Sequence, residues 1–185
     1  MKRLCSIITL LVSFLLLTGK IQARITMPSL FSDGMVLQQQ NLVAIWGSSD
    51  RKQQRITVKP SWSNKEYTTV SDDLGRWKMK LETPVYGGPY NIEVSDGETV
   101  RLSNILIGEV WLCSGQSNME LPVSRIMDKF AEEVNSYENP MIHYIKVPYC
   151  YDFKMPQTDT KQAAWVPLTK DNVMNYSALC YFFAK

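Results

Sequence analysis

The sequence contains a single histidine in 185 residues, and this scarcity excludes a metal centre built from several imidazoles. Its four cysteines show no metal-site spacing, so neither a metal nor a cofactor is expected. Charge of one sign is not in excess, because 20 basic residues face 18 acidic ones. Such a balance gives no reason to expect nucleic acid or an anionic membrane surface as a partner. What remains is an ordinary globular composition, 45% hydrophobic and 21% charged.

The first 23 residues are typical of a secretory signal. A short basic start, Lys2 and Arg3, precedes an almost wholly apolar stretch over 4–17, and Ala23 provides a small residue at a cleavage position. A membrane anchor is the alternative, but the apolar stretch is shorter than the roughly 20 residues that a spanning helix needs. We therefore expect residues 1–23 to be removed, the protein to be exported to the periplasm or outside of a bacterial cell, and no membrane span to remain.

Residues 24–104 predict an all-β domain, sandwich-like or jelly-roll-like. Short β-rich runs follow one another, separated by turn signals about every 8–12 residues. The runs are Val36–Leu37, Leu42–Trp46, Ile56–Val58, Tyr67–Val70, Trp77–Leu81, Tyr90–Val94 and Thr99–Leu102. Apolar and polar residues alternate in Trp77–Leu81 and Tyr90–Val94, so each run is expected to present one face to a core that includes Trp77.

From residue 105 the pattern changes to that of an α/β domain. Ile105–Ile107 and Val110–Cys113 are continuously apolar, which favours strands covered on both faces, as in a parallel sheet flanked by helices. The further elements expected are a helix over 124–134, a strand over 141–147, a loop over 149–172 and a helix over 175–185. So few elements cannot bury both faces of a sheet, and we expect residues 105–185 to be only the N-terminal part of such a domain.

The run Gly108–Glu120 predicts a strand that ends in a sharp turn and continues as a helix. Gly115 allows the turn, and Ser117 would lie on it or on the first helical residue. Two interpretations of Ser117 are open. It can cap the helix, with Glu120 three residues later completing a capping box. It can also be a nucleophile, although the Gly-x-Ser-x-Gly elbow is not matched because Met119 stands in place of the second glycine.

The segment Ile107–Glu120 closely resembles the first conserved block of bacterial sialate O-acetylesterases, which are secreted members of the SGNH (GDSL-like) hydrolase superfamily. Other parts of the chain are similar to the same family. They are Ser32–Gln38, Ala44–Gly47, Gly87–Tyr90, Asn104–Gly108 and Tyr176–Ala184. The resemblance implies a β-domain over 24–104 and, over 105–185, the first part of an SGNH-type three-layer domain with a parallel sheet.

The resemblance also implies roles for individual residues. Ser117 would attack the acetyl carbonyl of an acetylated sugar, and its own backbone N–H would contact the oxyanion. Gln116 and Asn118 would orient the turn or touch the substrate. The family's other oxyanion donors, a Gly and an Asn, and its His and Asp come from later blocks that the 185 residues do not include. We therefore expect little turnover from this chain by itself.

The remaining chemically capable residues have structural interpretations. His143 lies in the middle of an expected strand and is interpreted as a packed histidine, not as a base for Ser117. Cys113 and Cys180 lie among apolar neighbours and are expected in the core, as is Trp111. Together with Cys150 they make an odd number in a mature exported chain, and their pairing is left open.

Two other functions remain open. The chain can be a truncated or inactive relative that acts as a carbohydrate-binding or scaffold module, or an acetylesterase for another glycan, such as acetylated xylan. The oligomeric state is left open as well. A chain that ends within an α/β domain is expected to expose apolar surface.

Overall fold

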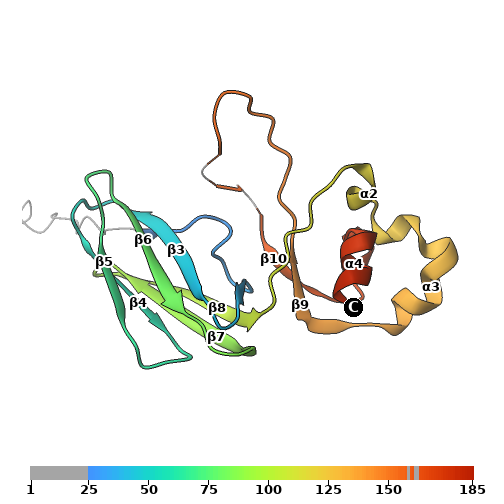
Figure 1. The fold of residues 1–185 in the computed structure, drawn as a ribbon, viewed down its shortest axis with the longest axis horizontal. Coiled ribbons are helices and arrows are strands. Elements are labelled where there is room, and N and C mark those ends of the chain that lie inside the picture. Colours follow the sequence, from blue (N-terminus) through green and yellow to red (C-terminus); the bar gives the residue numbers. More distant parts are fainter. Residues whose placement is uncertain (1–24, 158, 161–162) are drawn as a thin grey trace, which may run out of the picture.

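A computed structural model describes residues 25–157, 159–160 and 163–185 of the 185. The expected signal over 1–23 lies outside the described residues. Figure 1 shows the strands of the N-terminal part at one end of the molecule, the helices at the other, and β9 and β10 between them. Among the described residues, no helix is long and apolar enough to cross a membrane.

The N-terminal part forms a three-stranded sheet, in the order β1-β3-β6, and a five-stranded sheet, in the order β2-β8-β7-β4-β5. The strands are β1 Ile25–Thr26, β2 Val36–Gln38, β3 Leu42–Ser49, β4 Arg55–Pro60, β5 Tyr67–Val70, β6 Arg76–Glu82, β7 Gly87–Ser95 and β8 Thr99–Gly108. Neighbouring strands run antiparallel, with the exception of β2 and β8, which run parallel. The expected all-β character of this part is therefore what the chain adopts.

One apolar core lies between the two sheets and follows the alternation read from the sequence. In β6, Trp77 and Leu81 are buried and Met79 packs against the core. In β7, Ile92 and Val94 are fully buried. Alternate side chains of a strand point to opposite faces, which is why these runs contribute every second residue to the core. The prediction that Trp77 belongs to the core is confirmed.

Ile105–Ile107 completes β8 instead of starting a parallel sheet. Tyr90 of β7 lies opposite Ile105, and Leu37 of β2 lies opposite Ile107. All three residues of the run are buried in this part of the molecule. Strand β8 thus runs through residue 104, where the sequence predicts a boundary, because pairing with β7 and, over Leu106–Gly108, with β2 extends it to Gly108.

The expected strand Val110–Cys113 is wrong, because these residues are exposed coil. Trp111 is 66% exposed and Leu112 91% exposed, so the prediction of Trp111 as a core residue is also wrong, as is that of Cys113. An apolar run becomes a strand only when a neighbouring strand satisfies its backbone N–H and C=O groups. No described strand pairs with this run.

The C-terminal part combines helices with a two-stranded sheet. Its elements are α2 Ser117–Glu120, η1 Val123–Arg125, α3 Met127–Ser136, β9 Asn139–Ile145, β10 Trp165–Leu168, η2 Val173–Asn175 and α4 Ala178–Ala184. Strands β9 and β10 are antiparallel, so the expected parallel sheet is not found among the described residues. Strand β10 lies inside the expected loop over 149–172. The sequence does not predict this strand because it contains Pro167, and the register of its pairing with β9 shifts directly after that proline.

A second apolar core holds the C-terminal part together. Val134 of α3 and Tyr181 of α4 are almost fully buried in it, together with Leu168 of β10. Ile126 and Met127 pack against this core, as expected from the apolar side of the predicted helix. Phe130 contacts the ring of Phe182, with the two ring centroids 5.2 Å apart. The helices are thus placed by packing on α4, which Figure 1 shows below α2 and beside α3.

We expect Leu81→Ala to lower the free energy of unfolding by about 2–5 kcal/mol, because Leu81 is fully buried and its removal leaves a cavity. Leu74→Ala is the matched control, since Leu74 is 69% exposed, and it should change this free energy by less than about 0.5 kcal/mol. Denaturant unfolding measures both. Equal losses in the two variants would contradict the assignment of the core.

Candidate functional site

The turn that precedes α2 places Ser117 on the first helical residue. Gln116 has an extended backbone and is the cap, with its carbonyl accepting from the N–H of Met119 at 2.9 Å. No side chain caps this helix, so the interpretation of Ser117 and Glu120 as a capping box is wrong. The Ser117 side chain is consequently not used for capping.

Met119 fixes the turn to the start of α4. Its sulfur accepts from the hydroxyl of Ser177 at 3.7 Å and lies 3.5 Å from the sulfur of Cys180. Gly115 completes this packing, because a Cβ at that position would lie 3.2 Å from the Met119 Cβ. A side chain at 115 would therefore require Met119 to shift by a few tenths of an ångström, a close approach that the sequence alone did not show.

Backbone hydrogen bonds hold the segment after α2 against the same region. The N–H of Val123 donates to the carbonyl of Tyr176 at 2.9 Å, and the N–H of Ala178 donates to the carbonyl of Leu121 at 2.8 Å. Ser177, between these two contacts, caps α4 by accepting from the N–H of Cys180 at 3.4 Å. The turn and the first turn of α4 thus form one hydrogen-bonded unit.

The three residues that the sequence singles out lie side by side and exposed. Gln116, Ser117 and Asn118 make no side-chain hydrogen bond with any other residue in the described part of the chain. Their amide and hydroxyl groups are therefore available to a ligand. The turn geometry depends on Gly115 and Met119 instead.

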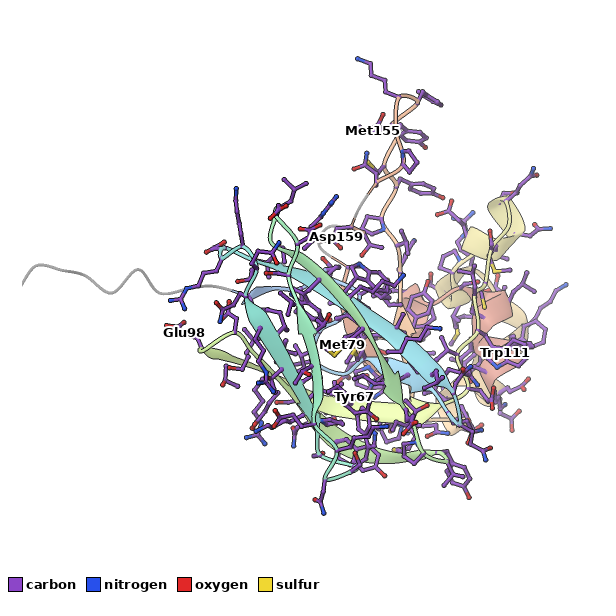
Figure 2. All side chains as sticks on the ribbon, turned by 60° about the vertical axis from the view of Figure 1, so that its left-hand side comes forward. Tyr67, Met79, Glu98, Trp111, Met155 and Asp159 are labelled. Carbon is purple, nitrogen blue, oxygen red and sulfur yellow. The ribbon has the colours of Figure 1, made fainter. Side chains whose placement is uncertain are left out.

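An apolar groove of about 1150 Å³ runs from β2 and β8 to α4. Ser114, Gly115 and Met119 of the turn line it, whereas Gln116, Ser117 and Asn118 do not. Trp111 and Leu112 line it too, and the Trp111 ring meets the edge of Phe183 with ring centroids 5.1 Å apart. Figure 2 shows Trp111 on the side of the molecule that carries the helices.

Carboxylates flank the coil that carries Trp111. Glu109, just after β8, accepts from the amide nitrogens of Gln38 at 3.0 Å and Gln39 at 2.6 Å. These two hydrogen bonds hold the pKa of Glu109 below its usual value. At the other end, the carboxylate of Glu120 lies 3.8 Å from the Lys146 ammonium. Both carboxylates are exposed and serve as anchors of the coil and of α2.

The single imidazole is engaged at the contact between the two parts of the molecule. The Nδ1 atom of His143 contacts the carbonyl oxygen of Gly34, and its Nε2 lies 3.1 Å from the carbonyl oxygen of Pro140. Nearby, the indole N–H of Trp165 donates to the carbonyl of Leu30 at 2.9 Å. The interpretation of His143 as a packed histidine is confirmed, because both ring nitrogens face backbone carbonyls. No cluster suited to a metal ion occurs among the described residues.

We expect the groove to bind a dye that fluoresces on apolar surfaces, and Leu112→Ser to reduce the signal, since Leu112 is 91% exposed and lines the groove. Leu74→Ser provides the control, because Leu74 is exposed away from the groove. Dye titration of the folded proteins measures the effect. An equal signal from wild type and both variants would mean that the dye binds elsewhere.

No model of a known protein family matches the sequence. The chain is 26% identical to human sialate O-acetylesterase over 172 residues, which cover 85% of this chain and 33% of that protein. The mouse sialate O-acetylesterase is 26% identical over 133 residues, covering 65% and 24% respectively. A crystal structure of a carbohydrate acetylesterase from Xanthomonas citri superposes with a TM-score of 0.79 and 32% identity, over 87% of this chain and 36% of that one.

The chain thus spans about a third of the length of the curated relatives that it matches. The two kinds of similarity, in sequence and in fold, point to the same group of esterases and cover most of the chain. In sequence and in fold the chain is thus similar to the N-terminal portion of sialate O-acetylesterase-like proteins.

Proposed function

We propose that the protein is an exported carbohydrate esterase that removes O-acetyl groups from sialic acids or related acetylated sugars, with Ser117 as the nucleophile. The observation that carries the proposal is the exposed Ser117 hydroxyl, which has no hydrogen-bond partner among the described residues. The turn that presents this hydroxyl is held in place by the packing of Met119. The similarity to a sialate O-acetylesterase and to a carbohydrate acetylesterase suggests the substrate class.

The chemistry would proceed in two displacements. The Ser117 oxygen attacks the acetyl carbonyl and forms a tetrahedral intermediate, which collapses to an acetyl-enzyme and releases the sugar hydroxyl. Water then hydrolyses the acetyl-enzyme. The backbone N–H of Ser117, at the start of α2, would donate to the oxyanion. In this role it would stabilise negative charge that develops only in the transition state.

Gln116 and Asn118 would contact the sugar. Both side chains are exposed beside Ser117, and both can donate and accept hydrogen bonds. A site that hydrogen-bonds a polar substrate discriminates strongly against analogues that lack the matching group. The two amides are therefore proposed as substrate-binding residues.

A serine hydroxyl needs a neighbouring base to become nucleophilic at neutral pH. His143 does not provide it, because its ring nitrogens face the carbonyl oxygens of Gly34 and Pro140. The proposal therefore requires a second imidazole as the base. It would come from outside the segment that matches the relatives. The relatives are about three times longer than the match, which leaves room for it.

We expect Ser117→Ala in the secreted gene product to lower kcat for acetate release by at least about a thousandfold, because the nucleophile is lost. Acetate release is measured from O-acetylated sialic acid and, in parallel, from acetylated xylan, which decides between these substrates. A fluorophosphonate probe should label Ser117 in the wild-type product and fail to label the variant.

Ser124→Ala is the matched control, because it makes the same serine-to-alanine change at an exposed serine of η1 outside the groove. It should retain both activity and labelling. Undiminished acetate release by a folded Ser117→Ala protein would refute the proposed nucleophile. Absence of both activity and labelling in the folded wild type would favour a binding module.

A further inference from the structure

The segment between β9 and β10 projects from the rest of the molecule as an arm, residues 146–157. Figure 1 shows it rising above both parts of the molecule, and Figure 2 shows Met155 near its tip, away from the sheets. Every residue of the arm is exposed, and none of them belongs to a helix or a strand. Its apolar side chains are therefore not explained by burial in a core of the described residues.

Large apolar side chains occupy every second position of the arm. The exposed fractions are 66% for Tyr149, 81% for Tyr151, 96% for Phe153 and 66% for Met155. In an extended chain, residues two positions apart point to the same side. The rings of Tyr149 and Tyr151 accordingly lie parallel, with an angle of 5° between their planes and centroids 6.1 Å apart. These two exposed rings are called the tyrosine platform below.

Polar contacts hold the arm at its base and at its bend. The Lys146 ammonium lies 3.8 Å from the carboxylate of Glu120, the last residue of α2. At the bend, the carboxylate of Asp152 accepts from the N–H of Lys154 at 2.8 Å and from the side-chain amide of Gln157 at 2.6 Å. The part of the chain that carries the platform is thus braced on both sides of it.

Just beyond the arm, Asp159 ties the chain to the N-terminal part of the molecule. Its carboxylate accepts from the backbone N–H of Ser29 at 2.9 Å and from the hydroxyl of Ser29 at 3.3 Å. Figure 2 shows Asp159 closer to the sheets than Met155. The platform is therefore carried by a segment that is attached to α2 on one side and to the N-terminal part on the other.

The base of the arm adjoins the turn that carries Ser117. Lys146 and Tyr149 line the apolar groove, which Gly115 and Met119 of the turn line as well. The second ring of the platform lies outside the groove. A ligand that enters the groove beside the turn can therefore extend along the platform toward the tip of the arm.

We propose that the tyrosine platform binds a sugar unit of an oligosaccharide whose acetylated unit is held at Ser117. The inference rests on the proposed function, which gives this site a carbohydrate substrate. The apolar face of a sugar ring carries C–H groups with partial positive charge, which stack on the electron-rich face of an aromatic ring. The tyrosine hydroxyls can also hydrogen-bond with sugar hydroxyls. The platform thus favours a chain of sugars over a single one.

The charges near the platform favour a saccharide over a nucleic acid. Bases also stack on aromatic rings, but the grooves that bind single strands are positively charged. The Lys146 charge is paired with Glu120, and the whole chain is nearly balanced, with 20 basic and 18 acidic residues. A ligand that combines apolar ring faces with hydroxyl groups therefore fits the platform better than a polyanion does.

The test is the affinity of the secreted gene product for two trisaccharides without acetyl groups, xylotriose and one that ends in sialic acid, measured by calorimetry. These ligands have no acetyl group to lose, so binding is read without the reaction. We expect at least one of them to bind more tightly than its monosaccharide. Tyr151→Ala should weaken this binding about tenfold, the order expected for the loss of one stacking contact.

Tyr151→Phe is the matched control, because it keeps the ring and removes only the hydroxyl, and it should retain most of the affinity. Equal affinities of the wild type and Tyr151→Ala for both trisaccharides would overturn the proposal, as would failure of both ligands to bind. A wild-type dimer in size-exclusion chromatography that Tyr151→Ala converts to a monomer would assign the platform to a second copy of the chain instead.

Failure of the proposed function gives a different result. Acetate release that persists in Ser117→Ala would refute the nucleophile, but it would leave the trisaccharide affinity and its loss in Tyr151→Ala unchanged. Conversely, a platform that binds no sugar would leave both the acetate release and its loss in Ser117→Ala unchanged.

Discussion

The pairing of β8 on both of its sides is the constraint on which the rest of the structure depends. Antiparallel β7 and parallel β2 hold β8 between them, and its last apolar residues, Ile105–Ile107, are buried, with Ile105 in the N-terminal core. Directly after it, Gln38 and Gln39 clamp Glu109 by two hydrogen bonds. The chain therefore leaves the sheets at one fixed point, from which the coil to Ser117 begins.

The Ser117 turn is anchored a second time, at its far end. Met119 packs between Gly115 and the first turn of α4, where it meets Ser177 and Cys180. Hydrogen bonds from the segment after α2 reach the same region. A turn held at both ends can leave the Ser117 hydroxyl exposed while its backbone keeps one geometry.

Predictions from sequence succeeded where a local pattern was sufficient. Alternation in β6 and β7 identified core residues such as Trp77 and Ile92, because side-chain direction in a strand follows from position alone. The apolar character of Val110–Cys113 was equally clear, yet the run is exposed coil. Whether an apolar run becomes a strand depends on a partner strand, and the pattern of the run contains no information about that partner.

The sequence by itself determined the strand-rich N-terminal part, the place of the turn that carries Ser117 and the resemblance to sialate O-acetylesterases, since these follow from periodicity and from a short motif. Only the tertiary structure decided that Ser117 is exposed and begins a helix instead of capping it, that His143 faces the carbonyls of Gly34 and Pro140, and that Met119 meets Cys180. The physical reason is that such outcomes depend on contacts between residues far apart in the chain, such as His143 with Gly34 and Met119 with Cys180, which no local pattern encodes.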